Sequence, residues 1–183
     1  MNSYKLDIAY DGTNYHGFQK QKDKPTIQEK LEEALDILLD SYELNYSGRT
    51  DAGVHAKSQI INIKTDSVLD LKKINSVNKM LGDSISINSI KIVSKNFHAR
   101  FGAIERTYKY LVRDSSANYP HLNNNTYQHC SLLNLEDLNK VAKLFIGEYN
   151  FSSFSRVEKF KNPERSIFSS RWIKKNEVYE YSI

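Results

Sequence analysis

The amino-terminal part of the chain begins with a strand pattern and continues with a helix pattern. Apolar side chains occupy every second position from Tyr4 to Tyr10, which is typical of a strand with one buried face. Thr26 and Glu29 have the spacing of a capping box, and apolar residues then follow at intervals of three and four. We therefore expect the first helix over residues 27–40.

A second set of elements follows. Residues 43–46 and 59–64 have the composition of strands, and a glycine-bounded loop lies between them. Asp70 is placed to cap a helix that Gly82 would end. Apolar alternation then predicts another strand over residues 85–93.

The rest of the chain repeats this strand and helix order. Residues 107–112 alternate as a strand does, and the polar segment 115–128 is predicted to be a loop. Asn134 can cap a helix that ends at Gly147. Two further strands are predicted, over residues 166–173 and 178–183.

These patterns predict two domains of the α+β class. The fold would consist of two α/β sandwich layers with mainly antiparallel sheets, with residues 1–100 in the first domain and 101–183 in the second. Because the chain stops at Ile183 inside an alternating strand, we expect the second domain to be truncated in its last strand and helix region.

Composition and charge permit an anionic partner. Apolar residues make up 39% and charged residues 26%, as in globular proteins, and the net charge is +4. Six basic residues face one acid between Lys91 and Arg113, and seven face two between Arg156 and Lys175. These stretches are candidates for phosphate contacts, although such runs also occur as solvated faces of strands.

Cysteine content and hydropathy indicate where in the cell the protein is located. Cys130 is the only cysteine, so neither an internal disulfide nor a cysteine-based zinc site is expected. The amino terminus lacks the apolar run of a signal peptide, and no stretch has the roughly 18 apolar residues of a membrane span. We expect a cytoplasmic protein with no membrane contact.

The loop that contains Asp51 carries the strongest chemical signal. Gly48 and Gly53 allow tight turns on either side of Asp51, and Arg49 lies two residues before it. An arginine this close can favour the ionised carboxylate or reach a phosphate. Spacing alone fits equally an ordinary turn with a surface ion pair.

The eight residues from Gly48 to His55, Gly-Arg-Thr-Asp-Ala-Gly-Val-His, resemble the active-site motif of the tRNA pseudouridine synthase A family. Residues 7–13 with the segment 15–19 resemble the first strand and loop of that family. Later blocks also match in order. They are Phe97-His98-Ala99-Arg100-Phe101, Arg106-Thr107-Tyr108-Lys109-Tyr110, residues 147–151 with Phe154, and Arg165-Ser166-Ile167.

The resemblance implies an isomerase that converts uridine to pseudouridine in the anticodon stem-loop of tRNA, at positions 38 to 40. Asp51 would be the catalytic nucleophile, Tyr108 would pack on the target uridine, and Arg49 would fill the gap left by a flipped base. Substrate contacts are also implied for Arg106, His98 and Arg100. The family acts without a cofactor and as a homodimer, so tRNA and a second copy are the expected partners.

The resemblance implies that family members continue beyond the last strand of this chain into an aromatic-leucine segment, a methionine-valine-arginine motif on a helix and a closing glycine. The alternative hypothesis is therefore a truncated, inactive RNA-binding relic of the family.

Two other kinds of site were weighed. Asp51 and His55 are four residues apart but lack further ligands at useful spacing, so no metal site is expected. An aspartate-dependent glycosidase would need a second carboxylate near Asp51, and the sequence does not place Asp11 or Glu105 there.

Overall fold

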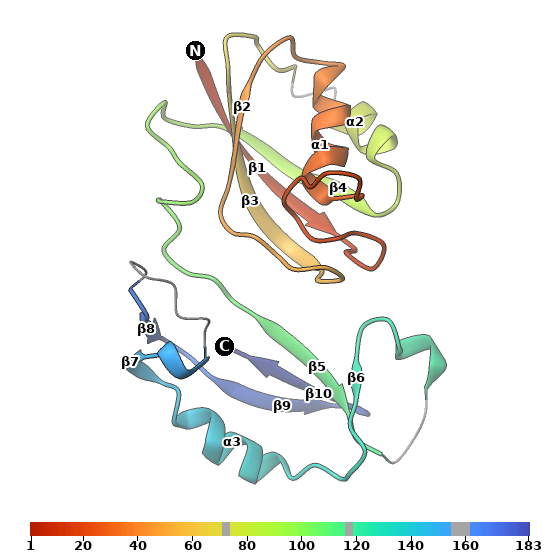
Figure 1. Cartoon of the computed structure of the whole chain (residues 1–183), viewed down its shortest axis with the longest axis vertical. Coiled ribbons are helices and arrows are strands. Elements are labelled where there is room, and N and C mark those ends of the chain that lie inside the picture. Colours follow the sequence, from red (N-terminus) through yellow and green to blue (C-terminus); the bar gives the residue numbers. More distant parts are fainter. Residues whose placement is uncertain (71–73, 116–118, 155–161) are drawn as a thin grey trace. The chain divides into compact units, whose positions relative to one another are not determined.

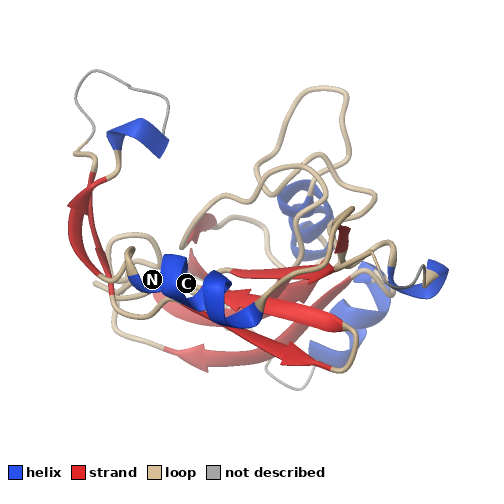
Figure 2. Ribbon diagram, turned by 90° about the horizontal axis from the view of Figure 1, so that it is seen from below, coloured by secondary structure: helices blue, strands red, loops and turns tan. Residues whose placement is uncertain are grey.

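The fold comes from a computed structural model that describes residues 1–70, 74–115, 119–154 and 162–183. The chain divides into two units, Met1–Ile104 and Glu105–Ile183. Both units combine helices with mainly antiparallel sheets, so the predicted α+β class is confirmed (Figure 1, Figure 2). Among the described residues no helix is long and apolar enough to cross a membrane.

The first unit is built on a four-stranded antiparallel sheet in the order β2-β3-β1-β4. Its strands are β1 (Asn2–Tyr10), β2 (Glu43–Tyr46), β3 (Ala56–Thr65) and β4 (Ile85–Ile92). Helices α1 (Ile27–Asp36) and α2 (Ile74–Leu81) complete the unit. The helix predicted from Asp70 overlaps α2, but residues 71–73 lie outside the described part of the chain.

The core of the first unit follows from the alternation along β1. Tyr4, Leu6, Ile8 and Tyr10 are all buried and pack with side chains of β3, β4 and both helices. Fully burying an aliphatic side chain of this size contributes about 1.5–3 kcal/mol. This apolar cluster fixes the face of the sheet that the helices cover.

The predicted cap of α1 is confirmed, but the predicted end of the helix is wrong. The Thr26 hydroxyl accepts a hydrogen bond from the Glu29 N–H at 3.3 Å. The helix stops at Asp36 rather than at residue 40, and the Leu38 amide turns back only three residues, to the Leu35 carbonyl, which the Leu39 amide also uses. Such shared acceptors are common where the last turn of a helix tightens.

The second unit has a four-stranded sheet in the order β6-β5-β10-β9 and a separate two-stranded ribbon of β7 and β8. The strands are β5 (Lys109–Arg113), β6 (Tyr127–Gln128), β7 (Gly147–Asn150), β8 (Glu164–Ile167), β9 (Arg171–Lys175) and β10 (Val178–Ser182). Helix α3 (Leu135–Lys143) packs on β9. As predicted, the Asn134 side chain caps α3, by accepting from the N–H groups of Glu136 and Asp137.

The single strand predicted over residues 166–173 is wrong. The chain leaves the ribbon after β8 and enters the other sheet as β9, so one apolar pattern serves two different pairings. Ser170, at the crossing, is buried and its hydroxyl lies 2.8 Å from the Tyr181 hydroxyl.

The predicted loop over residues 115–128 also needs correction, because it contains the 3-10 helix η2 (Pro120–Leu122) and strand β6. Buried Arg113 organises the described residues 119–126 of this segment. Its guanidinium donates to the Tyr119 carbonyl, the Asn123 side chain and the Thr126 hydroxyl at 2.7–3.1 Å. These bonds give a polar segment a defined course without an apolar core.

An asparagine joins a helix to a strand in each unit. In the first unit, Asn78 of α2 accepts from the Ile87 N–H at 2.8 Å and donates to the Ile87 carbonyl at 3.1 Å. In the second, Asn139 of α3 makes the same pair of bonds with Trp172 of β9, at 2.9 and 3.0 Å. Each side chain satisfies backbone groups that would otherwise need a neighbouring strand.

Candidate active site

Asp51 lies in the irregular segment between β2 and β3, residues 47–55. We call this segment the catalytic loop, after the role that the resemblance of its sequence implies for Asp51. The loop leaves the sheet at the end where β1 finishes, because Tyr10 pairs with Ala56 at the start of β3. A register shift between Ile8 and Tyr10 marks this end of β1. Bulges of this kind are frequent beside active sites.

Residues 11–18, which follow β1, form a seat for the catalytic loop. The Phe18 N–H donates to the Thr50 carbonyl at 3.0 Å, and the Gly53 N–H donates to the Tyr15 carbonyl at 3.2 Å. These bonds hold the loop one residue before Asp51 and two residues after it. The backbone of Asp51 is therefore fixed from both directions.

Two glycines allow the seat to approach this closely. A Cβ at Gly12 would lie 2.1 Å from the carbonyl oxygen of Val54, and one at Gly17 would lie 2.7 Å from that of Thr50. Gly17 also has a φ of +92°, a backbone conformation that L side chains rarely adopt. Any side chain at either position would displace the catalytic loop.

Side-chain hydrogen bonds complete the anchoring. The hydroxyls of Tyr10 and Thr50 lie 2.8 Å apart, and the Gln59 side chain donates to the Gly48 carbonyl. Burial raises the pKa of Tyr10, which outweighs the opposite effect of its hydrogen bond to Thr50. The phenol therefore stays protonated and can keep its contact with Thr50 throughout the neutral range.

Asp11 and His55 connect the seat to the end of the catalytic loop. The Asp11 Oδ1 atom lies 3.0 Å from His55 Nδ1 and accepts from the hydroxyl and N–H of Thr13 at 2.6 and 2.9 Å. The two Thr13 bonds, helped by His55, lower the pKa of Asp11. A glycosidase acid needs a raised pKa, so Asp11 is unsuited to that role.

The side chains of Asp51 and Arg49 are both exposed. No hydrogen bond or ion pair joins either of them to another side chain in the described residues, so the surface ion pair of an ordinary turn is not observed. The carboxylate and the guanidinium are thus both available to a ligand. Their positions depend on the backbone anchors.

His98 and Arg100 lie in the segment that follows β4. Buried Asn62 positions this segment by accepting from the Ala99 N–H at 2.8 Å. His98 Nδ1 accepts from the Arg100 N–H at 3.2 Å, and its ring centre lies 4.4 Å from that of Phe101. His98 therefore has a local structural role through Nδ1, while Arg100 is exposed.

Arg106 and Tyr108 belong to the second unit. Tyr108 is 52% exposed, and its backbone exchanges two hydrogen bonds with Ile183, at 2.8 and 3.0 Å. This pairing extends the ladder between β5 and β10 by one residue pair and holds an exposed aromatic ring at the start of β5. Arg106 is also exposed.

The residues of the seat were not identified as site residues from the sequence. Tyr10, Gly12 and Gly17 lie within the matched segments but about 40 positions before the loop that they contact. From the sequence, Asp11 is only a candidate second carboxylate of a glycosidase, and His55 is only a candidate metal ligand. One feature of the sequence could have connected them: residues 11–18 and 47–55 both lie in stretches that resemble the same family.

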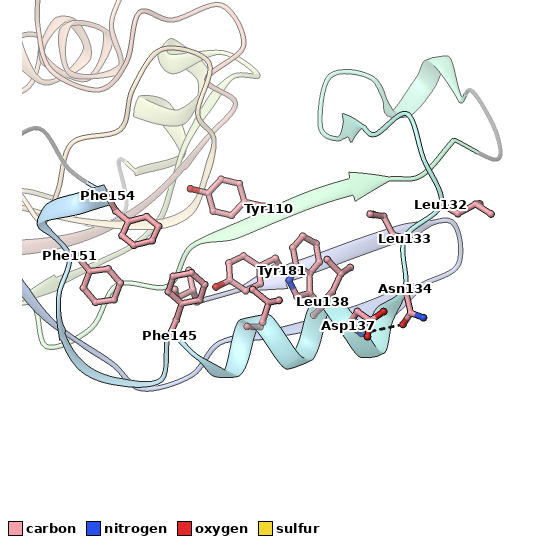
Figure 3. Close-up of a pocket in the computed structure, with 14 residues that line it drawn as sticks. Tyr110, Leu132, Leu133, Asn134, Asp137, Leu138, Phe145, Phe151, Phe154 and Tyr181 are labelled. Atoms are coloured by element: carbon pink, nitrogen blue, oxygen red, sulfur yellow. Dashed lines mark hydrogen bonds between the residues drawn. The ribbon is translucent and has the colours of Figure 1, made fainter.

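A cavity of about 730 Å³ lies within the second unit, between α3 and the sheet. Phe145, Phe151 and Phe154 gather at one end, and Asn134 and Asp137 lie at the other (Figure 3). None of the site residues predicted from the sequence lines this cavity. In the described residues there is also no group of three or more side chains that could hold a metal ion.

Comparison with known proteins identifies the loop and its seat with a family. Residues 8–102, which include both, match the family model described as tRNA pseudouridine synthase. The chain is 39% identical over 189 residues to tRNA pseudouridine synthase A of Borreliella afzelii, a match that covers the whole chain and 76% of that relative. The chain belongs to the tRNA pseudouridine synthase family.

Other members show similar agreement. The protein of Francisella philomiragia is 36% identical over 186 residues, which cover the whole chain and 72% of that relative. A protein of Protochlamydia amoebophila is 39% identical over 175 residues, which cover 92% of this chain and 68% of the relative. Enzymes of the tRNA pseudouridine synthase family are isomerases that convert uridine to pseudouridine, so tRNA is the substrate.

Proposed function

We propose that the chain isomerises uridines in the anticodon stem-loop of tRNA, with Asp51 as the nucleophile. The observation that carries the proposal is an exposed carboxylate that bonds to no other side chain of the described residues, on a loop whose backbone is held on both sides. A nucleophile needs a free, positioned carboxylate, and backbone anchors supply the position without occupying its oxygens. The choice of positions 38 to 40 rests on the resemblance of the motifs.

The proposed reaction begins with extrusion of the target uridine, because a base stacked in a stem is inaccessible to a protein carboxylate. Flipping a base costs a few kcal/mol in lost stacking. Arg49 would occupy the vacated space, and the exposed ring of Tyr108 would stack on the uracil. Arg106, Arg100 and His98 would contact the surrounding RNA, the arginines through phosphates.

Asp51 then assists the exchange of one glycosidic bond for another. The bond between C1′ and N1 breaks, uracil turns, and a bond between C1′ and C5 forms, while N1 gains the proton that C5 loses. Atoms and electrons balance without a co-reactant. No cofactor is needed for this isomerisation.

We further propose that the protein acts in the cytoplasm as a homodimer, as the resemblance implies. Sedimentation equilibrium over a range of concentrations tests the assembly. A mass of 21.2 kDa at every concentration without tRNA, and one chain per complex with tRNA, would contradict the homodimer.

Release of tritium from tRNA labelled at uridine C5 tests the reaction, because C5 loses its hydrogen. We expect turnover by the unaltered chain and a loss of at least about 10³-fold in Asp51→Ala, since Asp51 is the proposed nucleophile. Asp40→Ala is the control, because Asp40 is exposed and precedes β2 at the other end of the strand from the catalytic loop. Binding of tRNA without turnover by the unaltered chain would instead support an RNA-binding relic.

A further inference from the structure

The position of the Asp51 carboxylate depends on how the catalytic loop is held. Its amino-terminal half is secured at Thr50, through the Phe18 N–H and the Tyr10 hydroxyl. Its carboxyl-terminal half has only one backbone bond to the seat, from the Gly53 N–H to the Tyr15 carbonyl at 3.2 Å. The contact between Asp11 and His55 closes this weaker side.

His55 offers one ring nitrogen to two groups of the seat. Nδ1 lies 3.0 Å from the Asp11 carboxylate and 3.3 Å from the Gly12 N–H. A protonated Nδ1 donates to Asp11, whereas an unprotonated Nδ1 accepts from Gly12. In either state the end of the loop remains bonded to residues 11–12.

We infer that Asp11 and His55 form a latch that positions Asp51 for catalysis, an inference that rests on the proposed role of Asp51. Both are positioning residues, acting through the loop and not on the RNA. The Nδ1 atom provides the latch, and Nε2 has no part in it. Thr13 holds Asp11 in the orientation that meets His55.

The latch acts on the rate and contributes little to stability. Asp11 is 59% exposed and His55 36% exposed at their side chains, and exposed ion pairs contribute little to folding. A displacement of about 1 Å at a reacting group can nevertheless reduce the rate about 100-fold. Loss of the latch is therefore expected to lower kcat while leaving the melting temperature and the Kd for tRNA nearly unchanged.

Four variants test this inference in the tritium-release assay. Asp11→Ala and His55→Ala should each lower kcat by about tenfold or more, as expected for a misplaced nucleophile. The double variant should lose no more than either single change, because the two residues act as a unit. His55→Asn should retain most of kcat, since its amide can place a donor or an acceptor near the position of Nδ1.

The control is Glu33→Ala, which removes an exposed ion pair with Lys30 in α1, and it should leave kcat unchanged. Additive losses in the double variant would overturn the latch, because they would show independent roles. Equal losses in His55→Asn and His55→Ala would overturn it as well, because they would assign the function to Nε2.

Hydrogen exchange separates failure of the latch from failure of the proposed reaction. Amides of the catalytic loop should exchange faster in Asp11→Ala and His55→Ala than in the unaltered chain, whereas those of α1 should not change. Unchanged exchange of the loop amides in these two variants would refute the latch, even if the unaltered chain were fully active. Faster exchange in a chain that shows no turnover would support the latch and refute the reaction.

Discussion

Gly17 has a φ of +92°, and a Cβ at this position would lie 2.7 Å from the Thr50 carbonyl oxygen. Gly82, which ends α2, has a φ of +71°, but no atom lies within 4 Å of the position of its Cβ. The two glycines share a conformational requirement and differ in their surroundings. Substituting each of them therefore distinguishes the cost of the positive φ, which both share, from the effect of the close approach to Thr50, which only Gly17 has.

We expect Gly17→Ala to reduce both stability and activity, and Gly82→Ala to reduce stability alone. A left-handed conformation costs an alanine roughly 1–2 kcal/mol, a loss that both variants share. Only Gly17→Ala also pushes against Thr50, so its kcat should fall about tenfold or more as Asp51 moves. Urea unfolding and tritium release measure the two effects, and equal kcat values in the two variants would contradict the role of the close approach.

The contacts that hold the catalytic loop could be predicted from the sequence only where their residues are neighbours in the chain. Arg49 and Asp51 lie in one motif, and their shared loop was expected. The contact between Tyr10 and Thr50 spans 40 positions, and it arises because β1 and β3 pair in one particular register. Residue patterns predict that strands exist, but they do not state which strand ends meet.

Among the structural elements, α2 and α3 show how a helix is attached to a sheet by more than apolar contact. Apolar packing tolerates small rotations and shifts of a helix, whereas a pair of hydrogen bonds does not. Asn78 and Asn139 each bind both the N–H and the carbonyl of one strand residue. They therefore define the rotation of each helix about its axis and its position along the strand that it contacts.

Asn78→Ala is expected to destabilise the first unit by about 1–3 kcal/mol, because the Ile87 N–H and carbonyl lose their partner. Lys79→Ala is the matched control, since Lys79 is the next residue of α2 and is exposed. Urea unfolding measures both variants. A loss in Asn78→Ala no larger than that of the control would mean that water replaces the side chain without cost.

Elements that stay within one sheet were predicted well. β1 and β2 lie close to where the sequence placed them, and the caps at Thr26 and Asn134 are as expected. The prediction was wrong over residues 166–173, where one run of residues pairs first with β7 and then with β10. A change of partner strand does not alter the alternation of apolar and polar residues, because side chains alternate with a period of two in both pairings.

At the scale of the whole chain, the two units differ in what fills their interiors. The large cluster of buried apolar side chains belongs to the first unit. Among the described residues of the second unit, the buried apolar side chains are Ala142 and Tyr179, alongside buried Arg113, Asp114 and Ser170. The second unit therefore relies more on hydrogen bonds, whose net contribution is about 1 kcal/mol each.

We expect the second unit to open before the first. In hydrogen exchange with increasing urea, amides of β1 and β3 should exchange only through global unfolding, whereas those of β9 and β10 should exchange at a lower opening free energy. The reason is the smaller apolar area that the second unit buries. A common opening free energy for all four strands would show that the chain unfolds as one cooperative body.

The close approach between Gly12 and Val54 also has a genetic consequence. A larger residue at position 12 would shift the catalytic loop but leave in place the core and the two arginines outside the loop that we propose to contact RNA, Arg100 and Arg106. Cells with such an allele would contain a folded protein that occupies tRNA without modifying it. A deletion would instead leave those tRNAs accessible to other proteins. We therefore expect missense alleles at codon 12 and null alleles to give different phenotypes, although both lack the modified base.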